Sequence, residues 1–73
     1  MRSAVYIGNN LKRVRLQQAL SQQELADISG VTQKSITDIE NNYRAPHPNT
    51  VRKLANALGV EPKVLVGDLP ELQ

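Results

Sequence analysis

The stretch SQQELADISGVTQKSITDIEN, Ser21–Asn41, constrains the fold more than any other part of the chain. Ser21 and Glu24 have the spacing of a capping box, S-x-x-E, which begins a helix. Gly30 supplies a residue that tolerates a positive φ where that helix must end, and Thr32 can cap a second helix. The pattern therefore predicts two short helices joined by a tight turn. We expect them near residues 22–29 and 33–41.

The apolar residues of this stretch are expected to form an inward face on each helix. Leu25, Ala26 and Ile28 supply it in the first helix, and Ile36 and Ile39 supply it in the second. Ala26 lies ten residues before Ile36, where the helices would cross and a small side chain is needed, although alanine is also simply a good helix former. The residues left facing outward on the second helix are all polar: Gln33, Lys34, Ser35, Thr37 and Asp38.

The spacing of the apolar residues, and the prolines and glycines that flank them, predict three further helices. They are expected near Tyr6–Gln18, Pro48–Leu58 and Pro62–Val66. In the first, Ile7, Leu11 and Val14 keep the i, i+4, i+7 spacing of a core face. The other two begin with proline, which suits the first helical position, and His47 or Asn49 would cap the longer one. With no strand pattern, the fold class is all-α, a compact five-helix bundle.

Composition narrows the class of protein. The 73 residues suffice for one small domain, and the absence of Trp and Phe leaves an aliphatic core. No apolar run approaches the roughly 18 residues of a membrane span, and the start lacks the apolar segment of a signal peptide. The absence of cysteine excludes disulfides and thiolate metal sites and fits a reducing compartment. We therefore expect a cytoplasmic protein.

Catalytic and cofactor patterns are absent from the sequence. There is no G-x-x-x-x-G-K or G-x-G-x-x-G phosphate loop, and the single histidine, His47, has no cluster of other metal ligands around it in the sequence. The protein is not expected to be an enzyme, and neither a cofactor nor a metal is expected.

The distribution of charge favours a polyanionic partner. The formal net charge is only +2, but eight Lys/Arg stand against four Asp/Glu up to Leu58, which gives +4. From Gly59 onward one lysine stands against three acids, which gives −2. A basic body with an acidic end suits binding through the body.

Two short helices with an exposed polar row on the second have the layout of a helix-turn-helix, whose second helix lies in the DNA major groove. The chain resembles the lambda-repressor/Cro superfamily of XRE-type helix-turn-helix domains. The residues that carry the resemblance are LSQQELADISGVTQKSITDIEN (Leu20–Asn41) and TVRKLANALGV (Thr50–Val60). It extends over nearly the whole chain, so we expect a DNA-binding domain over residues 1–69 and a tail over residues 70–73.

The resemblance implies roles for individual residues. Base contacts are expected from Gln33, Lys34, Thr37 and Asp38, and phosphate contacts from Gln22, Thr32, Ser35, Asn41, Tyr43 and Arg44. Lys34 has phosphate as its main alternative, Asp38 can instead repel phosphate or pair with Lys34, and Tyr43 can instead cover the core. A structural ion pair between Arg15 and Glu40 would tie the first helix to the end of the third.

The chain departs from the family pattern at two turns. Ala19 stands where a glycine often precedes L-S-Q, which suggests a wider turn before the second helix. Asn42 replaces the frequent glycine after E-N, a mild change because asparagine is the next best residue for a left-handed conformation.

The function implied is that of a transcriptional regulator, a repressor, that binds a palindromic operator in double-stranded DNA as a homodimer. It would be bacterial or phage-encoded, with no small-molecule effector. Candidate dimer residues are Leu65, Val66, Leu69 and Leu72, although Leu65 and Leu69 can instead close the core. The alternative function is an antitoxin or adaptor module that acts through protein–protein contacts. A third interpretation is a fragment that lacks its sensor domain.

Overall fold

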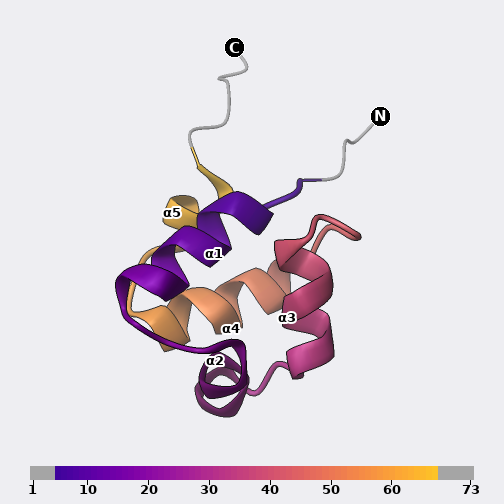
Figure 1. Ribbon diagram of the computed structural model, residues 1–73. Helices are drawn as coiled ribbons and strands as arrows, with labels where there is room; N and C mark the ends of the chain where they lie inside the picture. The colour runs from indigo at the N-terminus through magenta and orange to yellow at the C-terminus, as the bar shows by residue number, and fades with distance from the viewer. Residues whose placement is uncertain (1–4, 68–73) are drawn as a thin grey trace.

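The computed structural model describes residues 5–67, which contain five helices and no strand. They are α1 (Gly8–Gln17), α2 (Gln22–Ser29), α3 (Gln33–Glu40), α4 (Pro48–Leu58) and α5 (Pro62–Val66) (Figure 1). The predicted all-α bundle is confirmed. Three helices have the predicted bounds, whereas α1 begins two residues later and ends one residue earlier than expected, and α3 ends one residue earlier than expected. The expected tail, with Leu69 and Leu72, lies outside the described residues.

Capping side chains explain where α2 and α3 begin. The hydroxyl of Ser21 accepts from the backbone N–H of Glu24 at 3.0 Å, and the Glu24 carboxylate accepts from the Ser21 N–H at 2.8 Å. These two bonds complete the predicted capping box. Gly30 ends α2 with a φ of 77°, and the Thr32 hydroxyl accepts from the Ser35 N–H at 3.2 Å to cap α3.

The cap of α4 is His47, one of the two residues considered for that role. Its Nδ1 atom accepts from the backbone N–H of Asn49 at 3.1 Å, so the imidazole takes the place of the usual hydroxyl or carboxylate. Pro48 occupies the first helical position, and Gly59 ends the helix with a φ of 71°.

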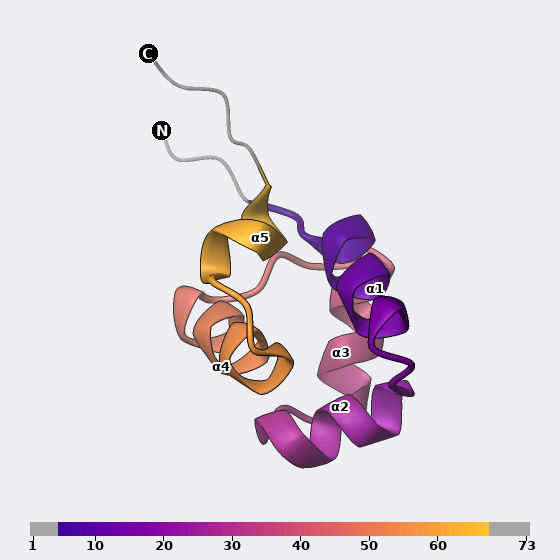
Figure 2. The same ribbon diagram turned by 90° about the vertical axis from the view of Figure 1, so that its left-hand side faces the viewer.

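The five helices pack around one aliphatic core. Helix α4 contacts α2 and α5, α1 contacts α3 and α5, and α2 contacts α3 (Figures 1 and 2). The buried apolar side chains are Ile7, Leu11, Val14, Leu25, Ala26, Val31, Ile36, Ile39, Val51, Leu54, Ala55, Leu58 and Leu65. Leu65 is fully buried, so it closes the core and is unavailable to a dimer surface.

One expected core residue lies on the surface. Ile28 is 56% exposed, so its predicted place in the apolar stripe of α2 is wrong. The neighbouring prediction holds, because Leu25 and Ala26 are buried. With 3.6 residues per turn, Leu25 and Ala26 stand about 100° apart, and Ile28 stands about 110° from the middle of the face that they define, beyond its edge.

The turn between α1 and α2 is closed by Ala19 in the left-handed region, with a φ of 57°. The Ala19 N–H donates to the Leu16 carbonyl at 2.9 Å, and the Leu20 N–H donates to the Arg15 carbonyl at 3.1 Å. These are the two bonds of a Schellman motif, which glycine usually closes. The expected wider turn does not form, because alanine adopts the conformation of the glycine it replaces.

Replacing Ala19 with glycine is therefore expected to stabilise the protein. A left-handed conformation costs a residue with a Cβ roughly 1–2 kcal/mol, and glycine loses about 0.5–1 kcal/mol of that gain through its greater freedom in the unfolded chain. The free energy of unfolding should rise by about 0.5–1 kcal/mol in chemical denaturation.

Asn42 is the matched control, because it also has a positive φ, 58°. Its side-chain oxygen accepts from the backbone N–H of Gly8 at 3.0 Å. Asn42→Gly should relieve a smaller backbone strain, because asparagine tolerates this conformation better than alanine, and it should also lose this bond, so it should not stabilise the protein. Equal gains from both variants would contradict this account.

Candidate nucleic-acid interface

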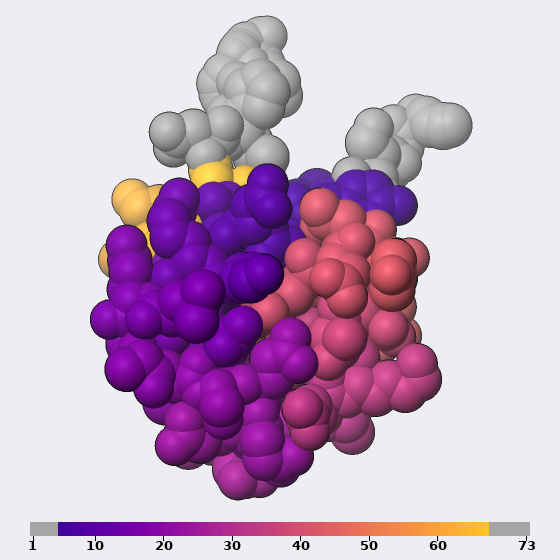
Figure 3. All heavy atoms as spheres, viewed as in Figure 1, coloured from indigo at the N-terminus to yellow at the C-terminus, as the bar shows by residue number. Residues whose placement is uncertain are grey.

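Helix α3 presents a polar face that is separate from its core face. Ile36, Ile39 and Glu40 are buried, whereas Thr32, Gln33 and Lys34 are exposed and Ser35, Thr37 and Asp38 are half-buried. Helix α3 and the loop after it form one continuous area of the molecular surface beside α1 and α2 (Figure 3). The residues predicted to contact DNA from α3 therefore share one side of the molecule.

Two of these side chains pair with each other across one helical turn. The Lys34 ammonium lies 3.3 Å from the Asp38 carboxylate, with side-chain exposures of 84% and 24%. This is the pairing that the sequence left open for Asp38. An exposed pair of this kind contributes only about 0.3–0.5 kcal/mol. Its partners are therefore easily separated by a competing base or phosphate.

The loop after α3 brings a second cation to the same side. The Arg44 guanidinium donates to the hydroxyl of Ser35 at 2.7 Å, so Arg44 folds back onto the first turn of α3. Tyr43 is 75% exposed, which excludes the alternative that it covers the core. Asn41 is exposed at the end of α3. All three are available to a partner on the α3 side.

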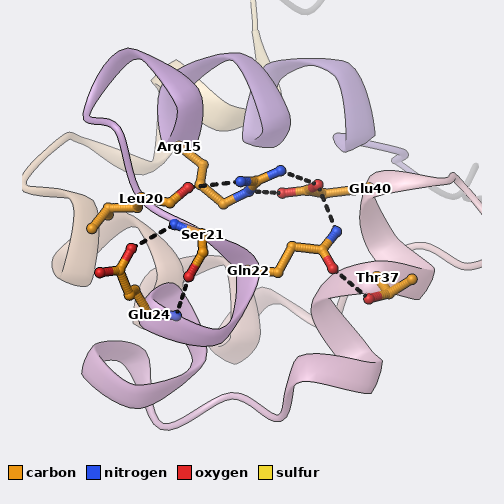
Figure 4. Close-up of polar contacts among 7 residues, drawn as sticks. All are labelled: Arg15, Leu20, Ser21, Gln22, Glu24, Thr37 and Glu40. Atoms are coloured by element: carbon orange, nitrogen blue, oxygen red, sulfur yellow. Dashed lines mark hydrogen bonds and ion pairs between the residues drawn. The ribbon is translucent and has the colours of Figure 1, made fainter.

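The predicted ion pair between Arg15 and Glu40 is present and buried. Arg15 Nε donates to Glu40 Oε2 at 2.6 Å, Nη2 donates to Oε1 at 2.9 Å, and Nη1 donates to the Leu20 carbonyl at 2.7 Å (Figure 4). The hydrogen bond to Glu40 is the largest influence on the pKa of Arg15 and raises it; burial opposes this rise, and the charge of Glu40 adds a smaller increase. The guanidinium therefore stays charged in any ordinary buffer and fixes α1 to the end of α3.

The side chain of Gln22 extends this contact to the exposed face. Its Nε2 atom donates to Glu40 Oε1 at 3.0 Å, and its Oε1 atom accepts from the Thr37 hydroxyl at 2.8 Å (Figure 4). Sequence reasoning expected a phosphate contact from Gln22 and missed this bridge. No local signal reveals it, because Gln22 is 15 positions from Thr37 and 18 positions from Glu40.

A second contact that the sequence did not reveal sets the position of α3 relative to α1. Gly8 is buried at the start of α1, where its N–H donates to the side chain of Asn42 just beyond α3. A Cβ atom on Gly8 would lie 2.5 Å from the Glu40 carbonyl oxygen and 2.7 Å from that of Ile39. Glycine is thus required at position 8 for the start of α1 to lie against the end of α3.

Within residues 5–67 there is neither a helix that could span a membrane nor a cluster of metal ligands. None of the helices there combines the length and apolarity needed to cross a bilayer. No group of three or more His, Cys, Asp or Glu side chains in that range is arranged to hold a metal ion.

Residues 11–65 match the model of the HTH_3 helix-turn-helix family. The chain is 29% identical over 62 residues to the immunity repressor protein of Bacillus phage phi105, covering 85% of this chain and 43% of the repressor. It is 38% identical over 53 residues to the transcriptional regulator PuuR of Escherichia coli, covering 73% of this chain and 29% of PuuR. The chain thus spans less than half the length of these curated relatives.

Solved structures show the same fold. The restriction-modification controller protein C.AhdI from Aeromonas hydrophila has a TM-score of 0.79 and 34% identity, over 84% of this chain and 92% of that one. The biofilm regulator SinR, solved in complex with DNA, has a TM-score of 0.80 and 29% identity, over 84% and 98% of the two chains. The family match covers most of the chain, and the structures agree with it in fold. The protein belongs to the HTH_3 helix-turn-helix family.

Proposed function

We propose that this chain recognises a specific sequence in double-stranded DNA, with α3 in the major groove, and that it regulates transcription as a repressor. The observation that carries the proposal is the exposed polar face of α3 on a rigid scaffold. An α-helix with its side chains, about 10–12 Å across, fits a major groove about 12 Å wide. The similarity to SinR, which was solved in complex with DNA, supports binding to DNA.

The chemistry of each side chain suggests its target. Gln33 can bond bidentately to adenine, and Lys34, once released from Asp38, can donate to guanine O6 or N7 or to a phosphate. Asp38 can accept from the N4 amino group of cytosine. Thr37 lies one turn beyond Gln33 on the side of α3 that faces α2. We assign base contacts to these four residues.

Phosphate contacts are assigned to the groups around this face. Hydroxyl, amide, phenol and guanidinium groups all bind phosphate oxygens and fix the register of a protein on the duplex. The residues proposed for this role are Thr32, Ser35, Asn41, Tyr43 and Arg44; Gln22 is considered below. Among them, Arg44 is held against α3 by its hydrogen bond to Ser35. A phosphate bound to Arg44 would therefore also lie beside the first turn of α3.

A homodimer is proposed because one short helix reads only a few base pairs. Two-fold pairing doubles the contacts and demands a palindromic operator with half-sites about 34–36 Å apart. Leu65 belongs to the core, which leaves the half-buried Val66 as the described residue among the candidates for the interface. We further infer that the protein acts on DNA in the cytoplasm of a bacterium. No enzymatic activity is proposed.

Replacing Gln33 with alanine tests direct readout. The variant is expected to lose about 1–3 kcal/mol of discrimination at one base position, because the bidentate bond to adenine is removed. Binding should be measured on the preferred duplex and on each single-base variant of it.

Gln23→Ala is the matched control for this test. Gln23 is also an exposed glutamine, but it lies on α2, where its amide bonds to Asp27 at 2.9 Å. It should leave every base preference unchanged. If Gln33→Ala weakens binding to all duplexes by the same factor, Gln33 does not read a base.

A further inference from the structure

The buried ion pair continues as a chain of hydrogen bonds to the face of α3. Arg15 binds both oxygens of Glu40, Glu40 Oε1 accepts from the amide of Gln22, and the Gln22 oxygen accepts from Thr37. The chain joins three helices and ends on a residue to which we assign a base contact (Figure 4).

The chemistry of the partners fixes the direction of every bond in this chain. An ionised carboxylate only accepts hydrogen bonds, so the NH₂ group of Gln22 must face Glu40. The oxygen of the same amide must then face Thr37, and Thr37 must be the donor, since an amide oxygen only accepts. The Arg15–Glu40 pair, with which this series of hydrogen bonds begins, is charge-assisted and buried, so it is the strongest contact of the series.

The consequence for Thr37 is that its hydroxyl cannot donate to a base. A hydroxyl has one proton, and that proton is held by Gln22 at 2.8 Å. In a helix the threonine side chain divides between two χ1 rotamers, and the bond to Gln22 selects one of them. The hydroxyl is thereby turned toward α2, and the methyl group takes a different staggered position.

We propose that Gln22 is a positioning residue whose amide holds Thr37 in one rotamer, and that Thr37 reads DNA through its methyl group. The base that a threonine methyl can recognise is thymine, through the C5-methyl group in the major groove. This inference rests on the proposed function, because it needs α3 in the groove. The amide carries a second N–H besides the one bonded to Glu40, so the phosphate contact that the sequence suggested for Gln22 stays a prediction beside this positioning role.

Two substitutions at Thr37 separate its methyl from its hydroxyl. Thr37→Val keeps a methyl and the branched shape but removes the hydroxyl, whereas Thr37→Ser keeps the hydroxyl and removes the methyl. The wild type and both variants would each be used to select duplexes from a random pool, followed by sequencing. We expect a thymine preference at one position that Thr37→Val retains within about twofold and Thr37→Ser reduces roughly fourfold, the value of one buried methyl group.

Gln22→Ala tests the positioning role in the same selection. It frees the Thr37 hydroxyl while leaving the Arg15–Glu40 pair in place, so the preference at the Thr37 position should fall and the preference at the Gln33 position should remain. Gln23→Ala, one residue along α2, should change neither. Thermal unfolding of each variant confirms that selection is carried out on folded protein.

Several results would overturn the inference. If Thr37→Ser keeps the preference and Thr37→Val loses it, the hydroxyl reads the base. If neither substitution at Thr37 changes the preference at any base position, Thr37 reads no base. If Gln22→Ala weakens binding to all duplexes equally and leaves the preference at the Thr37 position unchanged, Gln22 contacts a phosphate and does not position Thr37. A wild type that selects no motif would instead refute the proposed function itself.

Discussion

Replacing Glu40 with alanine is expected to lower the free energy of unfolding by about 3–5 kcal/mol, because it leaves the buried Arg15 charge without its partner. Gln22 would lose its anchor in the same step. For a domain of this size each kcal/mol corresponds to roughly 4–8 °C in Tm, so the midpoint should fall by at least about 12 °C. Thermal unfolding followed by circular dichroism measures this.

The control for the Glu40 variant is an exposed carboxylate with a comparable cation nearby. Glu61 lies 3.6 Å from Lys63, and both side chains are more than 70% exposed. Glu61→Ala should change stability by less than about 1 kcal/mol. A double variant, Arg15→Met with Glu40→Leu, should be more stable than Glu40→Ala, since it leaves no unpaired buried charge. An unchanged Tm in Glu40→Ala would refute a structural role for the pair.

Replacing Gly8 with alanine is expected to destabilise the protein comparably, for a steric reason. The new Cβ would lie 2.5 Å from the Glu40 carbonyl oxygen and from the Asn42 side-chain oxygen, and 2.7 Å from the Ile39 carbonyl oxygen. Overpacking costs about 1–3 kcal/mol, and displacing the Asn42 amide costs about another 1–3 kcal/mol by leaving the Gly8 N–H unsatisfied. In chemical denaturation the free energy of unfolding should fall by the sum of these two costs.

The adjacent residue gives the comparison for Gly8. Asn9 is exposed on the same turn of α1, so Asn9→Ala should be neutral or slightly stabilising through the higher helix propensity of alanine. By that propensity alone, Gly8→Ala would also be a gain of about 1 kcal/mol. A stabilised Gly8→Ala variant would therefore show that α1 does not pack on the end of α3 as described.

The helix ends were predictable because short-range chemistry determines them. The capping box of Ser21 and Glu24, the glycines that end α2 and α4, and the prolines that begin α4 and α5 act on neighbours within a few residues. The ion pair between Arg15 and Glu40 was predictable only through the family resemblance. Nothing in the local pattern relates two residues that are 25 positions apart.

What the sequence did not reveal depends on the tertiary arrangement. Ile28 was assigned to the core because it is apolar, but its angle on α2 relative to Ala26 places it on the surface. A wider turn is expected at Ala19, yet the hydrogen bonds of the Ala19 and Leu20 N–H groups to the last carbonyls of α1 close the turn with Ala19 in a left-handed conformation. The contact of Gly8 with Asn42 spans 34 positions, and no local pattern predicts it.

The sequence predicts which residues lie on the exposed face of α3 more completely than it predicts the hydrogen bonds that their side chains make within the protein. The polar residues from Gln33 to Asp38 follow from the periodicity that buries Ile36 and Ile39. Which of them are bonded to other side chains does not follow, because rotamers depend on partners from α2 and the loop after α3. Thr37 with Gln22 is one example, and Ser35 with Arg44 is another.

The central claim, that the protein reads a specific DNA sequence through α3, is tested most directly by selection from a random duplex pool over a series of salt concentrations. Sequencing of the bound fraction should show an enriched inverted repeat. The logarithm of the affinity for it should fall linearly with log[salt], with a slope of about −0.9 for each phosphate that a lysine or arginine neutralises. Weak binding with no enriched motif, even at low salt, would contradict the claim and favour a module that binds another protein.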